Sequence, residues 1–232
     1  LIVTRGSLLV PVAQYGKGRT KVTRMFTTTP FSIWELNEKL LHGLENIGWE
    51  FATQVQKETI PLALSGKDVI GQARTGSGKT AAFGLPTMNA CQASGELQAL
   101  ILAPTRELAN QVAEELNNIQ GEMGLIIQTV YGGTDLEKQA RSLQSGVDII
   151  VGTPGRVMDM TERGHIDLGK PDFFVLDEAD RMLDMGFFPD IMWIVERMSG
   201  RSQTLLFSAT FPQEIIDAAN EFMNDPDFVL TN

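Results

Sequence analysis

Short runs of apolar residues recur along the chain from Phe31 onward, and almost every position within each run is apolar. A strand with one exposed face would alternate apolar and polar residues, so these runs predict strands that are covered on both faces. The expected strands are Val69–Ala73, Ala99–Ala103, Ile126–Val130, Asp148–Gly152, Phe173–Asp177 and Thr204–Ser208, with a short edge strand at Phe228–Leu230.

Between these runs lie segments whose apolar residues recur every three or four positions, as on one face of a helix. One such stripe consists of Leu108, Ala109, Val112, Ala113, Leu116 and Ile119, and another of Ile215, Ile216, Ala219 and Phe222. A further helix is expected from Ile33 to Ile47, ending near Gly48. The alternation predicts a single α/β domain with a mostly parallel sheet, helices on both faces, and ligand sites at the carboxyl ends of the strands.

Composition narrows the class of protein. The 232 residues, 43% of them hydrophobic, suffice for one large α/β domain with a substantial core. Cys91 is the only cysteine, which excludes an intrachain disulfide and a cysteine-rich zinc site and favours a cytoplasmic location. The apolar runs are far shorter than the roughly 20 residues that span a bilayer, so we expect no transmembrane helix and no membrane partner.

Charge is unevenly distributed. Residues 1–30 contain five basic and no acidic residues, so the net charge of -10 divides into +5 for this segment and -15 for residues 31–232. We interpret residues 1–30 as a basic extension of unknown role. Its role could be that of an uninformative extension, an arm that binds nucleic acid, or a targeting segment. The overall acidity argues against binding nucleic acid through bulk positive charge.

The strongest local motif is the run ARTGSGKT, which follows the strand at Val69 and precedes a helical segment. Its small residues let backbone N–H groups turn toward phosphate oxygens, while Lys79 can reach the β- and γ-phosphates and the Thr80 hydroxyl can bind Mg²⁺. The run begins with Ala73 where the general pattern has glycine. The residues expected to bind the nucleotide here are Ala73, Thr75, Gly76, Ser77, Gly78, Lys79 and Thr80.

Two carboxylates follow the strand at Phe173. Asp177 can hold Mg²⁺ through water, and Glu178 can polarise the water that attacks the γ-phosphorus. Adjacent acids could also simply begin a helix. Their pairing with the upstream phosphate-binding loop favours catalytic roles for Lys79, Asp177 and Glu178, with ATP and Mg²⁺ as the ligands.

Asp177-Glu178-Ala179-Asp180 spells DEAD, and the chain from Phe31 to about Leu230 resembles the first RecA-like domain of a DEAD-box ATP-dependent RNA helicase. The resemblance implies a three-layer RecA-like fold of the P-loop NTPase class. It also implies that three loops line an RNA-facing surface, formed by Pro104, Thr105, Arg106, Gly132, Gly133, Thr153, Pro154, Gly155 and Arg156. Contacts of this kind with the RNA backbone do not distinguish one RNA sequence from another.

The resemblance extends to the adenine side and to a coupling segment. Phe31 and Trp49 are candidates to stack on adenine, Gln56 to read its edge and Thr53 to brace the phosphate-binding loop. Ala52 replaces the usual proline of the family, and Gln54 also departs from its pattern. Ser208, Ala209 and Thr210 are implied to couple the nucleotide state to RNA engagement by hydrogen bonding toward the Asp177–Asp180 segment.

Helicases of this family use a second RecA-like domain that closes over ATP and supplies arginines, and no such segment fits after Leu230. We therefore expect this chain alone to bind ATP and RNA weakly and to hydrolyse ATP inefficiently. Protein cofactors are possible further partners. The alternatives are a non-catalytic, ATP-gated RNA clamp or scaffold and a DNA-translocating relative.

Overall fold

A computed structural model describes residues 26–231, so the basic residues of the N-terminal extension lie outside the described residues. A seven-stranded sheet forms the centre of the domain, with strand order β5-β6-β4-β7-β8-β3-β9. All of its pairings are parallel. The strands are β3 (Val69–Gln72), β4 (Ala99–Leu102), β5 (Ile127–Val130), β6 (Ile149–Gly152), β7 (Phe173–Leu176), β8 (Gln203–Ser208) and β9 (Asp227–Leu230). The predicted strands and the predicted fold class are confirmed, with each strand end within one residue of its expected position.

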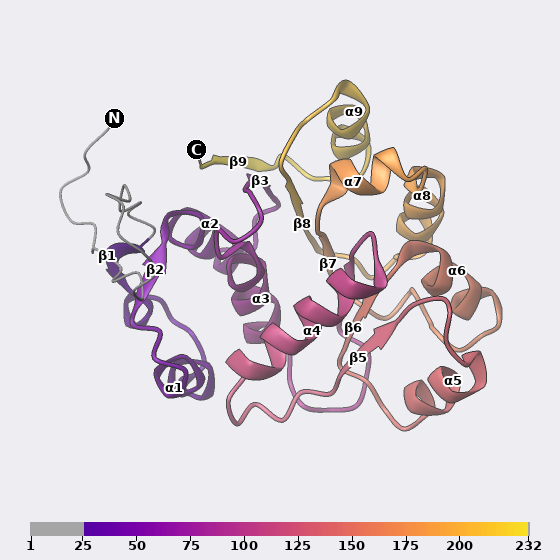
Figure 1. The fold of residues 1–232 in the computed structure, drawn as a ribbon, viewed down its shortest axis with the longest axis horizontal. Helices are drawn as coiled ribbons and strands as arrows, with labels where there is room; N and C mark the ends of the chain where they lie inside the picture. The colour runs from indigo at the N-terminus through magenta and orange to yellow at the C-terminus, as the bar shows by residue number, and fades with distance from the viewer. Residues whose placement is uncertain (1–25, 232) are drawn as a thin grey trace, which may run out of the picture.

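Helices cover both faces of this sheet (Figure 1). One face carries α1 (Glu38–Asn46), α2 (Gln54–Leu64), α3 (Lys79–Asn89) and α4 (Arg106–Ile119). The other carries α5 (Leu136–Gln144), α6 (Pro154–Glu162), α7 (Ala179–Asp184), α8 (Phe188–Arg197) and α9 (Gln213–Phe222). The two apolar layers are separate, because successive residues of each central strand point to opposite faces.

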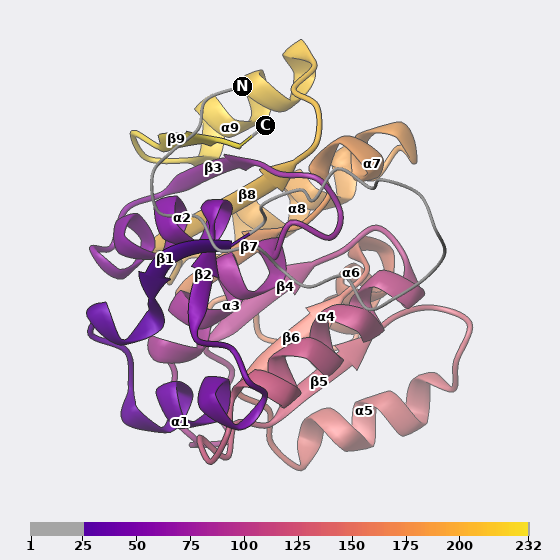
Figure 2. The same cartoon turned by 60° about the vertical axis from the view of Figure 1, so that its left-hand side comes forward.

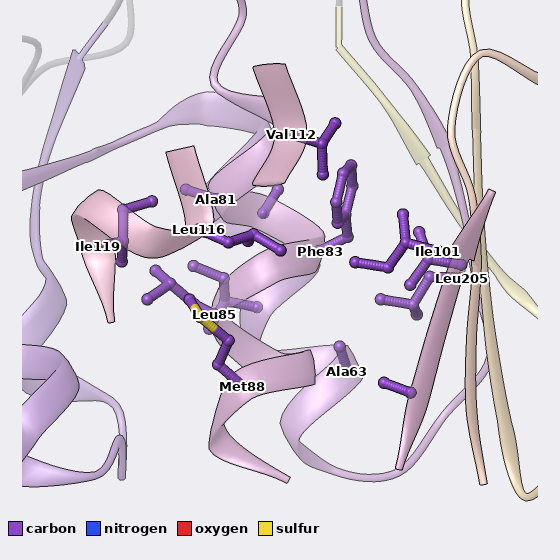
Figure 3. Packing of buried hydrophobic residues seen from close by; sticks show 14 of the residues in the cluster. Ala63, Ala81, Phe83, Leu85, Met88, Ile101, Val112, Leu116, Ile119 and Leu205 are labelled. Atoms are coloured by element: carbon purple, nitrogen blue, oxygen red, sulfur yellow. The ribbon is translucent and has the colours of Figure 1, made fainter. Parts of the chain in front are cut away.

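Helix α3 fills the middle of the first layer, where it packs against α2, α4 and the sheet (Figure 3). Phe83 of α3 lies against Phe207 of β8, with ring centroids 5.6 Å apart. A Cβ atom on Gly84 would come within 2.3 Å of the Leu116 side chain, so glycine is needed for α3 and α4 to approach this closely. This packing fixes the orientation of α3, whose first residue is Lys79.

A small second sheet joins β1 (Phe26–Pro30) to β2 (Phe51–Thr53) in antiparallel pairing, and it lies beside α2 in Figure 2. Thr27 donates a hydrogen bond from its hydroxyl to the Ala52 carbonyl at 2.8 Å. The composition break proposed at Pro30 thus falls at the end of β1, and residues 26–30 pair with the rest of the fold.

The helix expected from Ile33 to Ile47 begins later than predicted. A short 3-10 turn spans Phe31–Ile33, and α1 begins at Glu38 after Asn37, whose side chain accepts a hydrogen bond from the Lys39 N–H at 2.9 Å. Ile33 is 61% exposed and lies outside α1. The cap decides the start of the helix, although the apolar spacing continues upstream. Among the described helices, none is both long and apolar enough to cross a bilayer.

Candidate functional site

The loops that carry the predicted nucleotide motifs follow three neighbouring strands. The phosphate-binding loop follows β3, Ser208 ends β8, and Asp177 follows β7, in the sheet order β7-β8-β3. Carboxyl ends of parallel strands meet at one edge of the sheet, which is where doubly wound folds bind their ligands. Residues almost a hundred positions apart in sequence therefore face one another.

The phosphate-binding loop has a left-handed backbone at Gly76 and Gly78, with φ values of +81° and +88°. Gly78 is the last residue before α3, so the loop leads directly into a helix N-terminus, where unpaired N–H groups attract anions. A Cβ atom at position 78 would lie 2.6 Å from Gln56 Nε2 and 2.9 Å from Thr53 Oγ1. Thr53, the residue expected to brace this loop, and Gln56, the residue expected to read adenine, thus both lie against Gly78.

Gln56 joins the loop to the start of α2. Its Oε1 accepts a hydrogen bond from the Thr53 N–H at 2.9 Å, and its Nε2 donates to the Gly78 carbonyl at 3.1 Å. The Gln56 side chain is buried, with 1% of the residue exposed. Both ends of the amide therefore bind protein groups here, and the adenine-reading role of Gln56 stays a prediction.

Three charged side chains meet at the mouth of the loop. Lys79 Nζ lies 2.9 Å from Asp177 Oδ1 and 3.1 Å from Glu178 Oε1. Burial lowers the pKa of the Lys79 ammonium, but the carboxylates of Asp177 and Glu178 outweigh burial and the pKa is raised overall. Burial raises the pKa of Asp177, against the opposing effect of the Lys79 charge. Lys79 therefore remains charged and compensates two carboxylates in a largely dry site.

Glu178 adopts a backbone conformation that is unusual for a residue other than glycine. Its φ and ψ are 56° and 52°, in the left-handed region, which costs such a residue roughly 1–2 kcal/mol. The turn is held on one side by the Asp177 N–H, which donates to the Leu102 carbonyl at 2.9 Å, and on the other by the start of α7. Backbone strain at this carboxylate is typical of a functional site.

A cavity of about 310 Å³ adjoins these groups. It is lined by the predicted residues Trp49, Thr53, Gln56, Thr75, Gly76, Gly78, Lys79, Thr80, Asp177 and Glu178. It is also lined by Phe26, Gln111 and Glu115, which the sequence interpretation missed. Gln111 and Glu115 are four positions apart on α4, so their shared helical face was a usable signal.

Phe31 differs from its expected position. It is 3% exposed, packs edge-on against Trp34 with ring centroids 5.9 Å apart, and does not line the cavity. In the described residues Trp49 is therefore the better of the two candidates to stack on a base, and Phe26 joins it on the cavity wall.

The cavity offers oxygen donors suited to Mg²⁺, namely the Thr80 hydroxyl and the carboxylates of Asp177 and Glu178. No group of three or more His, Cys, Asp or Glu side chains among residues 26–231 could hold a metal ion by itself. Mg²⁺ is usually bound by one or two carboxylates together with substrate phosphates, and the two carboxylates of this cavity fit that pattern.

Ser208 and Thr210 hydrogen-bond to the acidic segment as expected. The Asp180 N–H donates to Ser208 Oγ at 3.0 Å, and the Thr210 hydroxyl and N–H donate to Asp180 Oδ2 at 2.8 and 3.0 Å. Partial burial raises the pKa of Asp180, but its hydrogen bonds with Thr210 and Ser208 outweigh burial, so the pKa is lowered overall. Ala209 accepts a hydrogen bond from Gln72 of β3 at 3.0 Å. The end of β8 thus connects β3 with the Asp177–Asp180 segment.

The loops predicted to face RNA follow β5, β6 and β4, which are neighbours at the other end of the sheet. Thr105 caps α4, with its Oγ1 accepting from the Leu108 N–H at 3.3 Å, and Pro154 is in the first turn of α6. A Cβ atom added to Gly132, Gly133 or Gly155 would meet nothing within 4 Å, so their backbone is open to a ligand. Of the remaining members of the set, Pro104 and Thr153 lie just before α4 and α6, Arg106 is the first residue of α4, and Arg156 is in the first turn of α6.

A family model for DEAD/DEAH box helicases matches residues 53–218. The chain belongs to the DEAD/DEAH box helicase family. Among its curated DEAD-box relatives, RNA helicase CrhR of Synechocystis sp. is 50% identical over 87% of this chain and 41% of its own length. ATP-dependent RNA helicase CshA of Listeria monocytogenes is 48% identical over 87% of this chain and 39% of its own. This DEAD-box chain thus spans about two fifths of the length of these relatives.

Solved structures of the same family share the fold. A DEAD box protein from the hyperthermophile Methanococcus jannaschii matches with a TM-score of 0.84 and 40% identity, over 88% of this chain and 56% of the other. A hypothetical ATP-dependent RNA helicase from Sulfolobus tokodaii matches with a TM-score of 0.80 and 39% identity, over 84% of this chain and 57% of the other. The RecA-like fold expected of a DEAD-box domain is confirmed.

Replacing Gly78 with alanine in this DEAD-box domain should weaken both folding and nucleotide binding. A left-handed alanine costs about 1–2 kcal/mol, and the added methyl also displaces Gln56 from the phosphate-binding loop. Urea unfolding and titration with a fluorescent ATP analogue measure the two effects. Gly66→Ala is the matched control, because Gly66 has a φ of +86° and open space around it. Equal nucleotide affinity in the two variants would show that displacing Gln56 from Gly78 does not affect nucleotide binding, against this prediction.

Proposed function

We propose that this chain is the N-terminal, ATP- and RNA-binding domain of an ATP-dependent RNA helicase. The observation that carries the proposal is the Lys79, Asp177 and Glu178 cluster, which opens onto one cavity with the phosphate-binding loop. In the longer protein, ATP binding and hydrolysis would drive local unwinding of RNA duplexes or remodelling of RNA–protein complexes. The proposed domain assignment is residues 1–30 as a basic extension and residues 31–232 as the first RecA-like domain, with β1 at the end of the extension paired to β2 of the domain.

The roles of the residues follow from their contacts. Lys79 would exchange its two carboxylate partners for the β- and γ-phosphates, with the backbone N–H groups of residues 75–80 around the same oxygens. Mg²⁺, held by the Thr80 hydroxyl and Asp177, would neutralise charge on the phosphate oxygens. Glu178 would accept a proton from the attacking water, and its strained backbone would keep the carboxylate aimed into the cavity.

Several partners follow from this function. A second RecA-like domain of the same protein would supply arginines to the γ-phosphate, a contribution worth roughly 10³–10⁵ in rate in related phosphoryl transfer. RNA would bind through its sugar-phosphate backbone at the Pro104–Arg106, Gly132–Gly133 and Thr153–Arg156 loops, without sequence selection. Protein cofactors and a cytoplasmic location complete the proposal.

Competition between nucleic acids tests the RNA assignment. With the longer protein loaded with a non-hydrolysable ATP analogue, single-stranded RNA should displace a labelled RNA at about 10-fold lower concentration than DNA of the same sequence. A difference of that size corresponds to one or two hydrogen bonds to 2′-hydroxyl groups. Fluorescence anisotropy measures the displacement. Equal competition by DNA would favour a DNA-translocating relative.

A further inference from the structure

We propose that Tyr131 and Gln139 are positioning residues that hold Arg106 and Arg156 in the orientation needed to contact the RNA backbone. Tyr131 lies in the segment between β5 and α5, which contributed only Gly132 and Gly133 to the predicted surface, and Gln139 lies in α5 itself. The inference rests on the proposed RNA-binding function and adds to it the residues that organise the surface.

Gln139 connects two of the RNA-facing loops. Its Oε1 accepts a hydrogen bond from Arg156 Nη1 at 3.2 Å, and its Nε2 donates to the Tyr131 carbonyl at 3.0 Å. The Arg156 guanidinium also donates to the Thr134 carbonyl, through Nη1 and Nη2, at 3.4 Å. Gln139 of α5 therefore holds Arg156, which follows β6, against the loop that follows β5.

Tyr131 makes the corresponding contact to the third loop. The Arg106 guanidinium carbon lies 5.1 Å from the centre of the Tyr131 ring, within the range of a cation–π interaction. The Tyr131 ring is half-buried against the apolar layer beside α4, so it offers a fixed platform, whereas Arg106 itself is exposed. Residue 131 thus contacts Arg106 through its ring and Gln139 through its carbonyl.

The chemistry of these tethers points to a ligand. Both arginines are held by neutral groups, and among residues 26–231 neither forms an ion pair, whereas Arg163 and Arg181 pair with carboxylates. A carboxylate would anchor an arginine more strongly but would cancel its charge. A neutral amide and an aromatic ring hold the orientation and leave the positive charge for a phosphate. An arginine also has five N–H donors, so donors remain on Arg156 beyond those that its tethers use.

The dependence of RNA affinity on salt tests the proposal. The logarithm of the binding constant falls linearly with the logarithm of the salt concentration, and the slope of that line is proportional to the number of phosphates that the protein neutralises. The 232-residue chain would be titrated with a fluorescein-labelled oligouridylate at several low ionic strengths. Gln139→Glu introduces a carboxylate at Arg156, so we expect weaker binding and a slope shallower by about 0.7, as for Arg156→Ala. Gln139→Ala keeps the charge but frees the guanidinium, so we expect affinity to fall by about 2- to 12-fold with an unchanged slope.

Matched controls separate positioning from folding. Tyr131→Leu should weaken binding about 2- to 5-fold through the lost cation–π contact, while Tyr131→Phe, which keeps the ring, should bind as the parent does. Gln144→Glu makes the same charge change as Gln139→Glu at an exposed position of α5 and should leave the slope unchanged.

Two outcomes would overturn the inference and can be told apart. If Arg106→Ala and Arg156→Ala weaken RNA binding but the Gln139 and Tyr131 variants do not, the positioning role is wrong and the RNA-binding function stands. If the parent chain binds no RNA even at low salt, and the longer protein binds none with an ATP analogue, the proposed function itself fails. A variant that loses ATP-analogue binding together with RNA binding is taken as unfolded and is not interpreted. If Gln139→Glu binds the ATP analogue but its salt dependence of RNA binding is unchanged, the proposal is wrong.

Discussion

Replacing Glu178 with glutamine is expected to lower the RNA-stimulated rate of ATP hydrolysis by a factor of about 10²–10⁴ in the protein that joins this chain to a second RecA-like domain. Glu178 lies 3.1 Å from Lys79 and lines the nucleotide cavity. Glutamine keeps the size and the hydrogen bond to the lysine but cannot take a proton from water. Steady-state ATPase assays at saturating RNA measure the effect, and ATP affinity should change far less than turnover.

Glu221→Gln is the control for this prediction, since Glu221 is exposed near the end of α9 and the change removes the same charge. Unchanged turnover in Glu178→Gln would revive the alternative of a non-catalytic, ATP-gated RNA clamp. A loss of ATP binding equal to the loss of turnover would instead show that Glu178 acts in binding rather than in proton transfer.

Replacing Lys79 with methionine should abolish ATP binding and also destabilise the domain, by about 3–5 kcal/mol near neutral pH. Lys79 compensates two carboxylates, and the side chains of Lys79 and Asp177 are only 9% and 2% exposed. Without the ammonium, burial and the neighbouring Glu178 both raise the pKa of Asp177 further. Urea unfolding of the 232-residue chain measures the loss of stability.

The pH dependence of this variant has a definite sign. The folded state would hold a proton on Asp177 more tightly than the unfolded state, so stability is lost as pH rises through the raised pKa and is recovered as pH falls. The destabilisation should thus be smaller at pH 5 than at pH 8. Lys67→Met is the control, because Lys67 pairs with Asp227 at the same 2.9 Å but on the surface. A destabilisation that grows on acidification would contradict the buried-pair explanation.

The strands and the nucleotide motifs could be predicted because their signals are local. A run such as Phe173–Leu176 is buried on both faces in the structure, so the absence of alternation in its sequence was informative. Lys79 and Asp177 could be paired in advance because each follows a strand of one parallel sheet, where the carboxyl ends converge.

What could not be predicted depends on contacts between distant segments. Three contacts leave no periodic pattern in the sequence. They are the hydrogen bond from the Gln56 amide to Gly78, the packing of Phe31 against Trp34, and the hydrogen bond from Arg156 to Gln139. The predicted start of α1 was wrong for a different reason. The apolar spacing that fits a helix also extends to residues before Asn37, although Asn37 caps the helix. At this boundary the capping residue, and not the apolar periodicity, determines where the helix begins.

The position of β3 in the sheet bears on how the domain folds. Both neighbours of β3 come from much later in the chain, since Val69 pairs with Leu205 of β8 and with Asp227 of β9. A growing polypeptide therefore has no sheet partner for β3 until β8 (residues 203–208) has been synthesised, and no second partner until β9 (residues 227–230) has followed. Such non-local pairing slows folding and leaves an apolar strand exposed in the meantime. Because the nucleotide site needs β3, β7 and β8 together, ATP can stabilise only the finished domain and cannot shield the incomplete chain.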